Sequence, residues 1–191
     1  NISIMCNCCF PLNFDKSGLT QLNEKDLNIQ LPIFGEVITS QDKGIKYIVL
    51  NRDEKESNKI IIDMYWEDEW HPCFCVDWIY RLVRKCQYKR TYDHQSICIY
   101  LTAEKKIFKF YSSNWADDGS TYNVCIAKHR CFTYPLIDFE LDNSVPVVYV
   151  STWNHMFSKE QIDPIEYLKE RKYQIYCKNE DIEYFTDIVG I

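Results

Sequence analysis

The stretch IKYIVLNRDEKESNKIIIDMYW, residues 45 to 66, decides the fold class of this chain. Two runs of β-branched and aromatic residues, 45–51 and 59–66, flank the charged segment RDEKES, a composition typical of two strands joined by a turn. Other strand-like runs precede and follow it, at 28–40, 96–101, 106–112, 120–128 and 144–152. Short strands separated by turn signals predict a mainly β domain, a β-sandwich or barrel, rather than a parallel βαβ sheet.

Helical patterning is confined to three segments. Residues 75–86 carry apolar side chains at i, i+3, i+4 and i+7, namely Val76, Ile79, Tyr80 and Val83. Segment 163–172 begins with an Asp-Pro pair and ends with basic residues, and segment 179–190 begins with Asn followed by two acidic residues. We therefore expect one β-rich domain with a few peripheral helices.

No repeat and no Pro/Ser-rich linker divides the chain. Its expected parts are an N-terminal arm (1–29) that makes an assembly contact, a β-sandwich core (30–160) with a helical insertion near 75–87, and a C-terminal helical extension (161–191).

The composition argues against several functional classes. With 5 glycines in 191 residues, the chain contains neither GxGxxG nor GxxxxGK[ST], which argues against the familiar nucleotide-binding loops. A net charge of −6 argues against a general nucleic-acid binder, which needs basic residues to neutralise phosphates. The basic run RLVRKCQYKR, 81–90, is interpreted as a solvated helix face, with a nuclear localisation patch as the alternative. No run approaches the ~20 apolar residues of a membrane span.

Ten cysteines are a high count for a chain whose start, NISIMCNCCF, has no basic flank and does not resemble a secretion signal. Thiols in a protein made inside the cell are normally reduced, so disulfides would form late or between molecules.

A zinc site is one hypothesis for these thiols. Its candidate ligands are Cys6, Cys8 and Cys9; His71, Cys73 and Cys75; and Cys125, His129 and Cys131. Structural zinc sites usually have two pairs of ligands two to four residues apart, and the usual CxxC pair is absent here. The alternative that these thiols pack as small apolar groups is favoured.

A cysteine-dependent hydrolase is a second hypothesis. Cys75 opens the predicted helix, where a thiolate is stabilised, and either His71 or His155 could serve as its base, with Asn154 beside the latter. No local signature of a known cysteine hydrolase surrounds Cys75. An acidic pair for sugar hydrolysis, drawn from Asp63, Glu67, Asp68 and Glu69, is a third hypothesis, set against the ordinary alternative of a solvated strand end.

The order of residues in three segments is more specific than any of these patterns. The first segment has an apolar, an aromatic and an acidic residue before a strand that begins with Lys: LPIFGEVITSQDKGIKYIVL. The second has a Trp, a Tyr seven residues later and then Ala-Lys: FKFYSSNWADDGSTYNVCIAK. The third is an aliphatic strand that ends in Thr: VPVVYVST. This succession resembles the polyhedrin and granulin family, the occlusion-body matrix proteins of insect DNA viruses. The matching positions are Leu31, Phe34, Glu36, Lys46, Trp115, Tyr122, Ala127, Lys128, Tyr149 and Thr152.

The resemblance covers residues 30–50, 107–128 and 146–152, well under half of the chain. His129 to Phe132 replace the family's glycine run after Ala-Lys, and the interval from Lys128 to Pro146 is shorter than in baculovirus members. A diverged member, such as a nudivirus polyhedrin, would fit this pattern. These departures leave the trimer contacts open.

The resemblance implies a jelly-roll β-sandwich that forms trimers and then a crystal in the infected cell, usually in the nucleus. Such a crystal embeds virions and dissolves in an alkaline midgut, and its protein needs no active site and no cofactor. The partners would be other copies of the chain and the virions.

The composition is physically suited to that role. Fourteen tyrosines ionise near pH ~10 and ten cysteines near ~8.5, so alkali adds negative charge to an already acidic chain. Free thiols could pair between molecules after release into oxidising surroundings, and we expect the candidates to be Cys6, Cys8, Cys9, Cys131 and Cys177. On this view Cys125 to Cys131 mark the end of a core strand whose polar residues face a neighbouring subunit.

Overall fold

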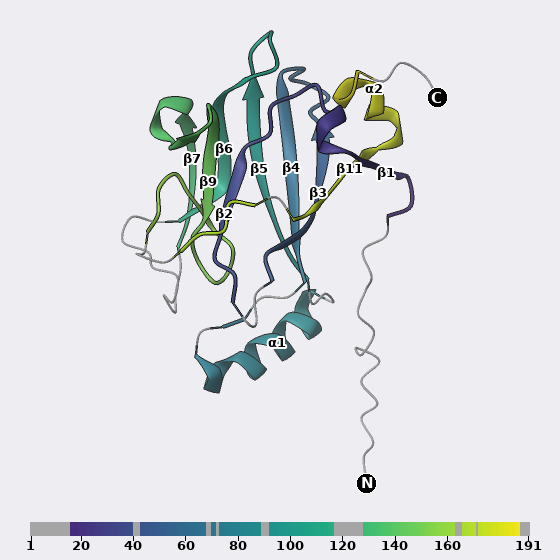
Figure 1. The fold of residues 1–191 in the computed structure, drawn as a ribbon. Helices are drawn as coiled ribbons and strands as arrows, with labels where there is room; N and C mark the ends of the chain where they lie inside the picture. Colours follow the sequence, from purple (N-terminus) through teal and green to yellow (C-terminus); the bar gives the residue numbers. More distant parts are fainter. Residues whose placement is uncertain are drawn as a thin grey trace.

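The structure is a computed structural model that describes residues 16–39, 43–67, 70–71, 73–88, 92–116, 128–162, 166–170 and 172–187. The predicted mainly β class is confirmed (Figure 1). The strands are β1 (Leu19–Leu22), β2 (Ile33–Glu36), β3 (Ile45–Arg52), β4 (Lys59–Trp66), β5 (Asp93–Leu101), β6 (Ile107–Ala116), β7 (His129–Pro135), β8 (Leu141–Asp142), β9 (Val145–Val150), β10 (Phe157–Ser158) and β11 (Gln174–Lys178). The α-helices are α1 (Phe74–Tyr88) and α2 (Ile182–Phe185), and short 3-10 turns cover Glu24–Asp26, Leu136–Asp138 and Asn179–Asp181.

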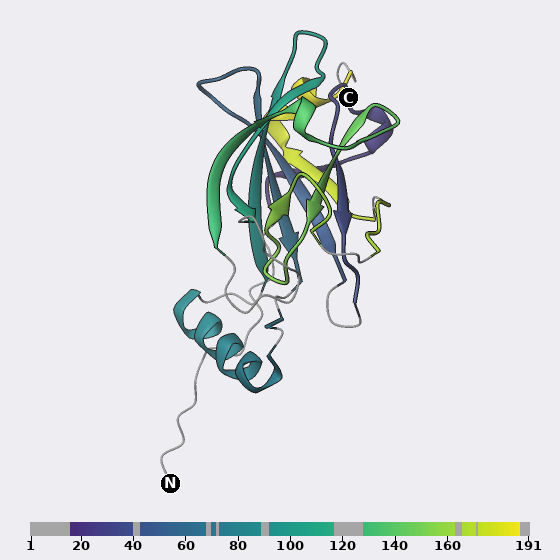
Figure 2. The ribbon, with the colours of Figure 1, turned by 90° about the vertical axis from the view of Figure 1, so that its left-hand side faces the viewer.

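The strands form one mixed sheet in the order β1-β11-β3-β4-β5-β6-β10-β9-β2, with β7 beside β6 and β8 beside β9. Neighbours from β3 to β6 are antiparallel, as expected, but the β11–β3, β6–β10 and β9–β2 pairs are parallel. The expected two-sheet antiparallel sandwich is not confirmed, because the paired strands follow one continuous path. Figure 2 shows this sheet curled around its interior.

The predicted hairpin of residues 45 to 66 is confirmed as β3 and β4, whose register runs from Ile45 opposite Trp66 to Arg52 opposite Ile60. In its turn, the Asp53 carboxylate accepts backbone N–H bonds from Lys55 and Glu56 and forms a 2.9 Å ion pair with Lys59. The residues of β4 alternate in burial along the strand, which is the period expected of a sheet with one covered face.

One large core fills the inside of the curl. The inner faces of β3 to β6 meet side chains from β2 and β9, and the buried members include Ile48, Ile62, Phe34, Val148 and Trp115. Burying each such side chain contributes roughly 1.5–3 kcal/mol. On β2 the chain needs glycine at Gly35, because a Cβ there would lie 2.7 Å from the Tyr149 ring.

The expected C-terminal helical extension is largely wrong. The described residues 166–170 of the predicted helix 163–172 are not helical, and Leu168 instead forms an isolated antiparallel bridge with Glu36. The next segment is β11, which was not predicted and which inserts between β1 and β3. In place of a helix over 179–190, a 3-10 turn and the four-residue α2 end the described chain. Both the expected arm and the expected extension therefore contribute strands to the sheet.

The predicted strand over 120–128 falls almost entirely outside the described residues. Immediately after it, β7 pairs along β6, and all of its side chains are exposed or half-buried.

Candidate functional site

Several buried polar residues, among them Arg84, Asp93, Gln95 and His155, are linked to one another beneath α1. The helix lies at the end of the sheet where β4 ends and β5 begins (Figure 1). The helix faces the sheet with its polar side. The Asp77 carboxylate accepts the His71 backbone N–H at 2.9 Å, and the Arg81 guanidinium lies 4.2 Å above the Trp70 ring. The ring of Tyr80 packs edge-on against Trp153, 5.4 Å between centroids. Polar contacts therefore hold α1 in place.

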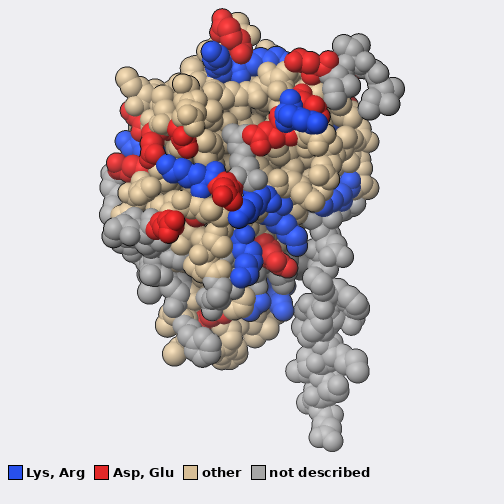
Figure 3. Space-filling view, in the orientation of Figure 1, with Lys and Arg blue, Asp and Glu red and all other residues tan. Residues whose placement is uncertain are grey.

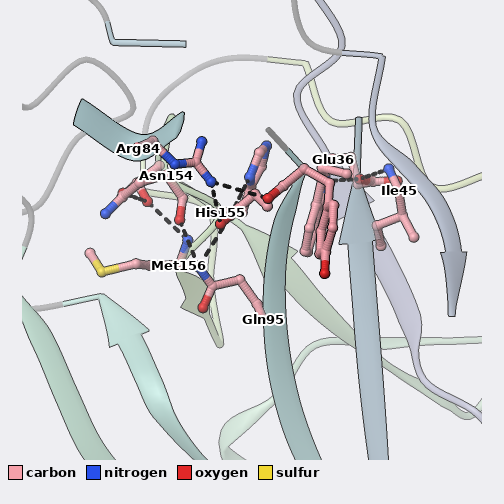
Figure 4. A network of polar contacts seen from close by, with 11 residues as sticks. Glu36, Ile45, Arg84, Gln95, Asn154, His155 and Met156 are labelled. Carbon is pink, nitrogen blue, oxygen red and sulfur yellow. Dashed lines mark hydrogen bonds and ion pairs between the residues drawn. The ribbon is translucent and has the colours of Figure 1, made fainter. Parts of the chain in front are cut away.

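The deepest of these contacts is made by Arg84, which is buried (Figure 4). One guanidinium nitrogen lies 3.4 Å from Asp93 Oδ1 and donates to the Tyr92 carbonyl at 3.2 Å. The second oxygen of Asp93 lies 2.9 Å from His155 Nδ1 and accepts from Gln95 Nε2 at 3.2 Å. Both oxygens of a buried carboxylate are thus paired, as burial of a charge requires.

These contacts set the protonation of Asp93. Burial alone would raise the pKa of its carboxyl, but the hydrogen bond and charge of His155, the charge of Arg84 and the Gln95 hydrogen bond together lower that pKa to about 2. The carboxylate therefore stays ionised in the folded protein at any ordinary pH.

His155 is placed by a tight loop. Its backbone has a φ of 57°, in the left-handed region, and its N–H bonds the Thr152 carbonyl at 2.9 Å. The Thr152 hydroxyl donates to Asn154 Oδ1 at 2.6 Å and accepts the Met156 N–H at 3.0 Å, which closes the loop. A strained backbone of this kind persists only where the surroundings determine it. The imidazole stacks on Trp66, with 4.3 Å between ring centroids.

The network continues from Trp66 to Glu36. The Glu36 carboxylate accepts the indole N–H at 3.2 Å and the backbone N–H of Ile45 at 2.7 Å. Gly44, whose φ is 78°, leaves room for it, because a Cβ there would lie 3.1 Å from both carboxylate oxygens. The result is a chain of buried polar groups from α1 to β2.

Solvent access decides what this network can do. The side chains of His155 and Asp93 are 1% and 6% exposed, so a substrate cannot reach the one close imidazole–carboxylate pair in this core. The arrangement fixes α1 and the 152–156 loop to the sheet.

A second polar cluster lies on the outer face of the sheet. Asp63 Oδ2 accepts from Asn51 at 2.7 Å, while its Oδ1 contacts both the His94 Nε2, at 3.1 Å, and the Ser96 hydroxyl. Asp63, His94 and Ser96 are the residue types of a hydrolase triad, but they are not arranged as in a triad. In a triad the imidazole uses one ring nitrogen for the carboxylate and the other for the hydroxyl, whereas here Nε2 faces Asp63 and lies 3.5 Å from Ser96.

Aromatic rings extend this outer face. Tyr65 stacks on Tyr47 at 4.8 Å and on His94 at 4.6 Å, and Tyr176 meets Tyr47 edge-on at 6.1 Å. The Lys16 ammonium donates to the Tyr176 hydroxyl at 2.7 Å. Burial, together with the nearby phenols of Tyr65 and its neighbours, raises the pKa of Tyr47 well above its ordinary value.

The hydrolase hypothesis is not supported by the geometry. Cys75 is exposed on α1, while His155 is buried beneath the opposite side of the helix. His71 Nδ1 accepts the Cys73 backbone N–H at 3.0 Å, and its ring packs against Trp153. The described part of the chain shows no contact between Cys75 and either histidine.

The geometry also gives no support to the zinc-site hypothesis or to the hypothesis of an acidic pair for sugar hydrolysis. No three His, Cys, Asp or Glu side chains gather as potential metal ligands within the described ranges, and Cys6, Cys8, Cys9 and Cys125 lie outside them. Of the acidic candidates, Asp63 is engaged as above, Glu67 is exposed and pairs with Lys46 at 3.8 Å, and Asp68 and Glu69 lie outside the described residues.

The disulfide candidates divide in three ways. Cys131 is exposed on β7 with the Tyr111 hydroxyl 3.2 Å from its Sγ. Cys177 is fully buried on β11, so the expectation that it bonds another molecule is wrong for the folded protein; burial raises its pKa to about 11. Cys6, Cys8 and Cys9 are not described.

Most positions of the family-like pattern are core positions. Leu31, Phe34, Glu36, Trp115, Tyr149 and Thr152 are buried. The Tyr149 hydroxyl donates to Glu140, which a 2.7 Å ion pair joins to Lys169. Lys46 and Lys128 are exposed and so are not core positions, and Tyr122 and Ala127 lie outside the described residues.

Sequence reasoning missed Arg84 and Asp93. The alternation of β5 carried a signal for the second, because Asp93 lies in the same period-2 register as Ile97 and Ile99. The interpretation of 81–90 as a solvated face is wrong for Arg84. Its signal was the polar stripe of Asp77, Arg81 and Arg84, which lies opposite Val76, Ile79 and Val83 on the helix.

The surface gives little sign of a ligand. On the face in Figure 3, Lys and Arg are interspersed with Asp and Glu. A groove of about 620 Å³ between β1 and α2 is lined by polar, acidic and apolar residues, without histidine or cysteine: Thr20, Gln21, Leu22, Asn23, Asp26, Asn179, Glu180, Ile182, Glu183 and Thr186. Within the described ranges no helix is long and apolar enough to cross a membrane.

Comparison with known proteins places the chain in no family: no family model, no curated protein and no solved structure matches it.

Proposed function

We propose that this chain is the matrix protein of a viral occlusion body. Copies associate, as trimers by analogy with the polyhedrin family, and pack into a crystal in the nucleus of the infected cell. The crystal embeds virions and dissolves at alkaline pH. The chain acts by assembly and not by catalysis, and it needs no cofactor.

The observation that carries this proposal is a set of weakly acidic side chains that the fold keeps neutral. Burial raises the pKa of Tyr47, Tyr149, Tyr100, Tyr184 and the Cys98 thiol, and raises that of Cys177 to about 11. A hydrogen bond with Cys131 raises the pKa of Tyr111.

The sign of the pH effect follows from linkage. Below the unfolded pKa, near ~8.5 for a thiol and ~10 for a phenol, both states hold the proton and stability is independent of these groups. Above it the unfolded state releases the proton and the folded state does not, so the free energy of unfolding falls. For the most deeply buried of these groups, Tyr47 and Cys177, the loss is at most about 1.4 kcal/mol per pH unit until the folded pKa is reached.

Two further features support assembly over catalysis. The His155–Asp93 pair is sealed in the core, and the half-exposed His94–Asp63 pair lacks the geometry of a triad, while large apolar side chains of α1 and β7, such as Trp78 and Phe132, are exposed. Six family-like positions are buried, which is expected if the resemblance reflects a shared fold.

Expression of the chain alone in insect cells tests this proposal. We expect intracellular crystals whose light scattering is stable near neutral pH and collapses between about pH 9 and 11. The variant Tyr47→Phe should need a higher pH to dissolve, with Phe132→Tyr, which adds an exposed phenol, as the matched control that does not. Failure of the chain to crystallise, or crystals that survive to about pH 12, would contradict the proposal.

A further inference from the structure

The outer side of α1 is an apolar surface. Its exposed fractions are 65% for Trp78, 52% for Leu82, 47% for Val83, 46% for Ile79 and 41% for Val76. Cys75 and Cys86 are exposed on the same helix. A monomeric soluble protein seldom exposes more than a few hundred Å² of contiguous apolar surface, so this face has the character of an interface.

The orientation of the helix is enforced and not incidental. An amphipathic helix normally turns its apolar stripe toward the core. Here Arg84 holds the opposite side against β5 through the ion pair with Asp93, and Asp77 on that same side accepts the N–H of His71 in the segment that leads into the helix. Rotating α1 to bury its apolar stripe would break both contacts. Figures 1 and 2 show the helix at the end of the sheet, with one side turned away from it.

The sequence of this face indicates what covers it. The segment CVDWIYRLVRKC, residues 75–86, has the same apolar pattern in both directions. A cysteine stands at each end, and large apolar residues stand fourth and fifth from each end: Trp78 and Ile79 from the start, Val83 and Leu82 from the finish. Cys75, Ile79, Leu82 and Cys86 follow a 4-3-4 spacing, the seam of two helices packed along their length. A surface that is its own complement under reversal fits an identical surface across a two-fold axis.

We propose that two copies of this chain bind through α1, antiparallel, about a two-fold axis that passes between Tyr80 and Arg81. Ile79 then lies opposite Leu82 of the partner subunit, Trp78 opposite Val83 of the partner subunit, and Cys75 opposite Cys86 of the partner subunit. The five half-exposed apolar side chains present roughly 500 Å² per copy, so the pair buries about 1,000 Å², the lower bound of a specific interface. The pairing would supply one contact of the proposed crystal, but it rests on α1 alone and requires no crystal.

The two cysteines give a direct test. They lie eleven residues apart on one helix, about 16 Å along its axis, whereas a disulfide needs Cα atoms within about 7 Å. A bond between Cys75 and Cys86 can therefore form only between two copies. Treatment of the dilute protein with diamide, which takes up the two hydrogens released by two thiols, should yield a covalent dimer. Digestion without reduction should then give a peptide linking Cys75 to Cys86.

Complementation sharpens this result. The variants Cys75→Ser and Cys86→Ser should each lose this linked peptide, and an equimolar mixture of the two should regain it. Linkage of Cys75 to Cys75, or of Cys86 to Cys86, would overturn the antiparallel arrangement. The absence of any link through α1 while other exposed cysteines react would overturn the pairing.

A non-covalent test uses sedimentation. Ile79→Lys should convert the dimer to a monomer that keeps the circular dichroism spectrum of the folded wild type, because the side chain is already half-exposed. Ile137→Lys, at a site 89% exposed on the 136–138 turn, is the matched control and should remain dimeric. A dimer that survives Ile79→Lys would overturn the inference. So would a finding that another segment of the chain, and not α1 of a second copy, covers the apolar face of α1. If Ile79→Lys remains dimeric and the chain still crystallises, the pairing is refuted and the proposed function stands. If Cys75 and Cys86 link between copies of a chain that never crystallises, the proposed function is refuted and the pairing stands.

Discussion

Replacement of Arg84 by Met removes the cation that joins α1 to the sheet and keeps the apolar stem. The change deletes hydrogen bonds to the Asp93 carboxylate and the Tyr92 carbonyl, which for a charged group are worth about 1.5–3 kcal/mol. It also removes the guanidinium 5.9 Å from the Tyr80 ring, worth about 0.5–1 kcal/mol. We expect the free energy of unfolding to fall by roughly 2–4 kcal/mol, measured by urea unfolding near pH 7. For a chain of this size the melting temperature should fall by roughly 5–15 °C.

The pH dependence separates this mechanism from a general loss of packing. Asp93, with its pKa lowered to about 2, contributes stability that is present above its unfolded pKa near ~4 and is lost as the pH falls toward 2. Without Arg84 the folded pKa of Asp93 rises, so this contribution is smaller in the variant. The stability difference between the two proteins should therefore shrink between about pH 5 and pH 2.

The matched control is Lys85→Met, which removes an exposed cation from the neighbouring position and should change stability by less than about 0.5 kcal/mol. A deficit for Arg84→Met that stays constant from pH 7 to pH 3, or that Lys85→Met reproduces, would refute the ion pair as its cause.

Three other outcomes follow from the structure. Glu36→Leu leaves two buried N–H donors without their acceptor and should cost about 2–4 kcal/mol, whereas Glu36→Gln keeps an acceptor oxygen and should cost less than half of that in the same urea titration. Tyr47→Phe should be close to wild type at pH 7 but lose less stability than wild type between pH 10 and 12, since it lacks one phenol with a raised pKa; parallel stability curves at alkaline pH would contradict this. With iodoacetamide at neutral pH, exposed Cys131 should react in the native state and Cys177 only after urea is added, as followed by mass spectrometry of the peptides; rapid native labelling of Cys177 would show that β11 is not held as described.

Local patterns predicted the central part of the fold. The β3–β4 hairpin and the β5–β6 pair were predictable because alternation and turn composition are properties of neighbouring residues. The range of α1 was predictable for the same reason, since its 3.6-residue period is local.

What the sequence did not show depends on distant partners. Segment 174–178 is a strand only because β3, whose Tyr47 pairs with Gln174, offers an open edge. The outward orientation of α1 depends on Asp93, which lies beyond the helix, and the placement of Asp93 depends in turn on His155, 62 residues further on. Periodicity reports which residues share a face, but it does not report which face the rest of the protein covers.

The position of β11 has a consequence for synthesis. This strand lies between β1 and β3, so the edge of β3 carries unpaired backbone donors and acceptors until residues 174–178 have been made. An open strand edge is a template for pairing with another chain, and pairing across so long a sequence separation is slow. A ribosome-bound chain therefore cannot complete its sheet until residues 174–178 have been translated. A reading frame interrupted before Gln174 should yield an aggregating chain.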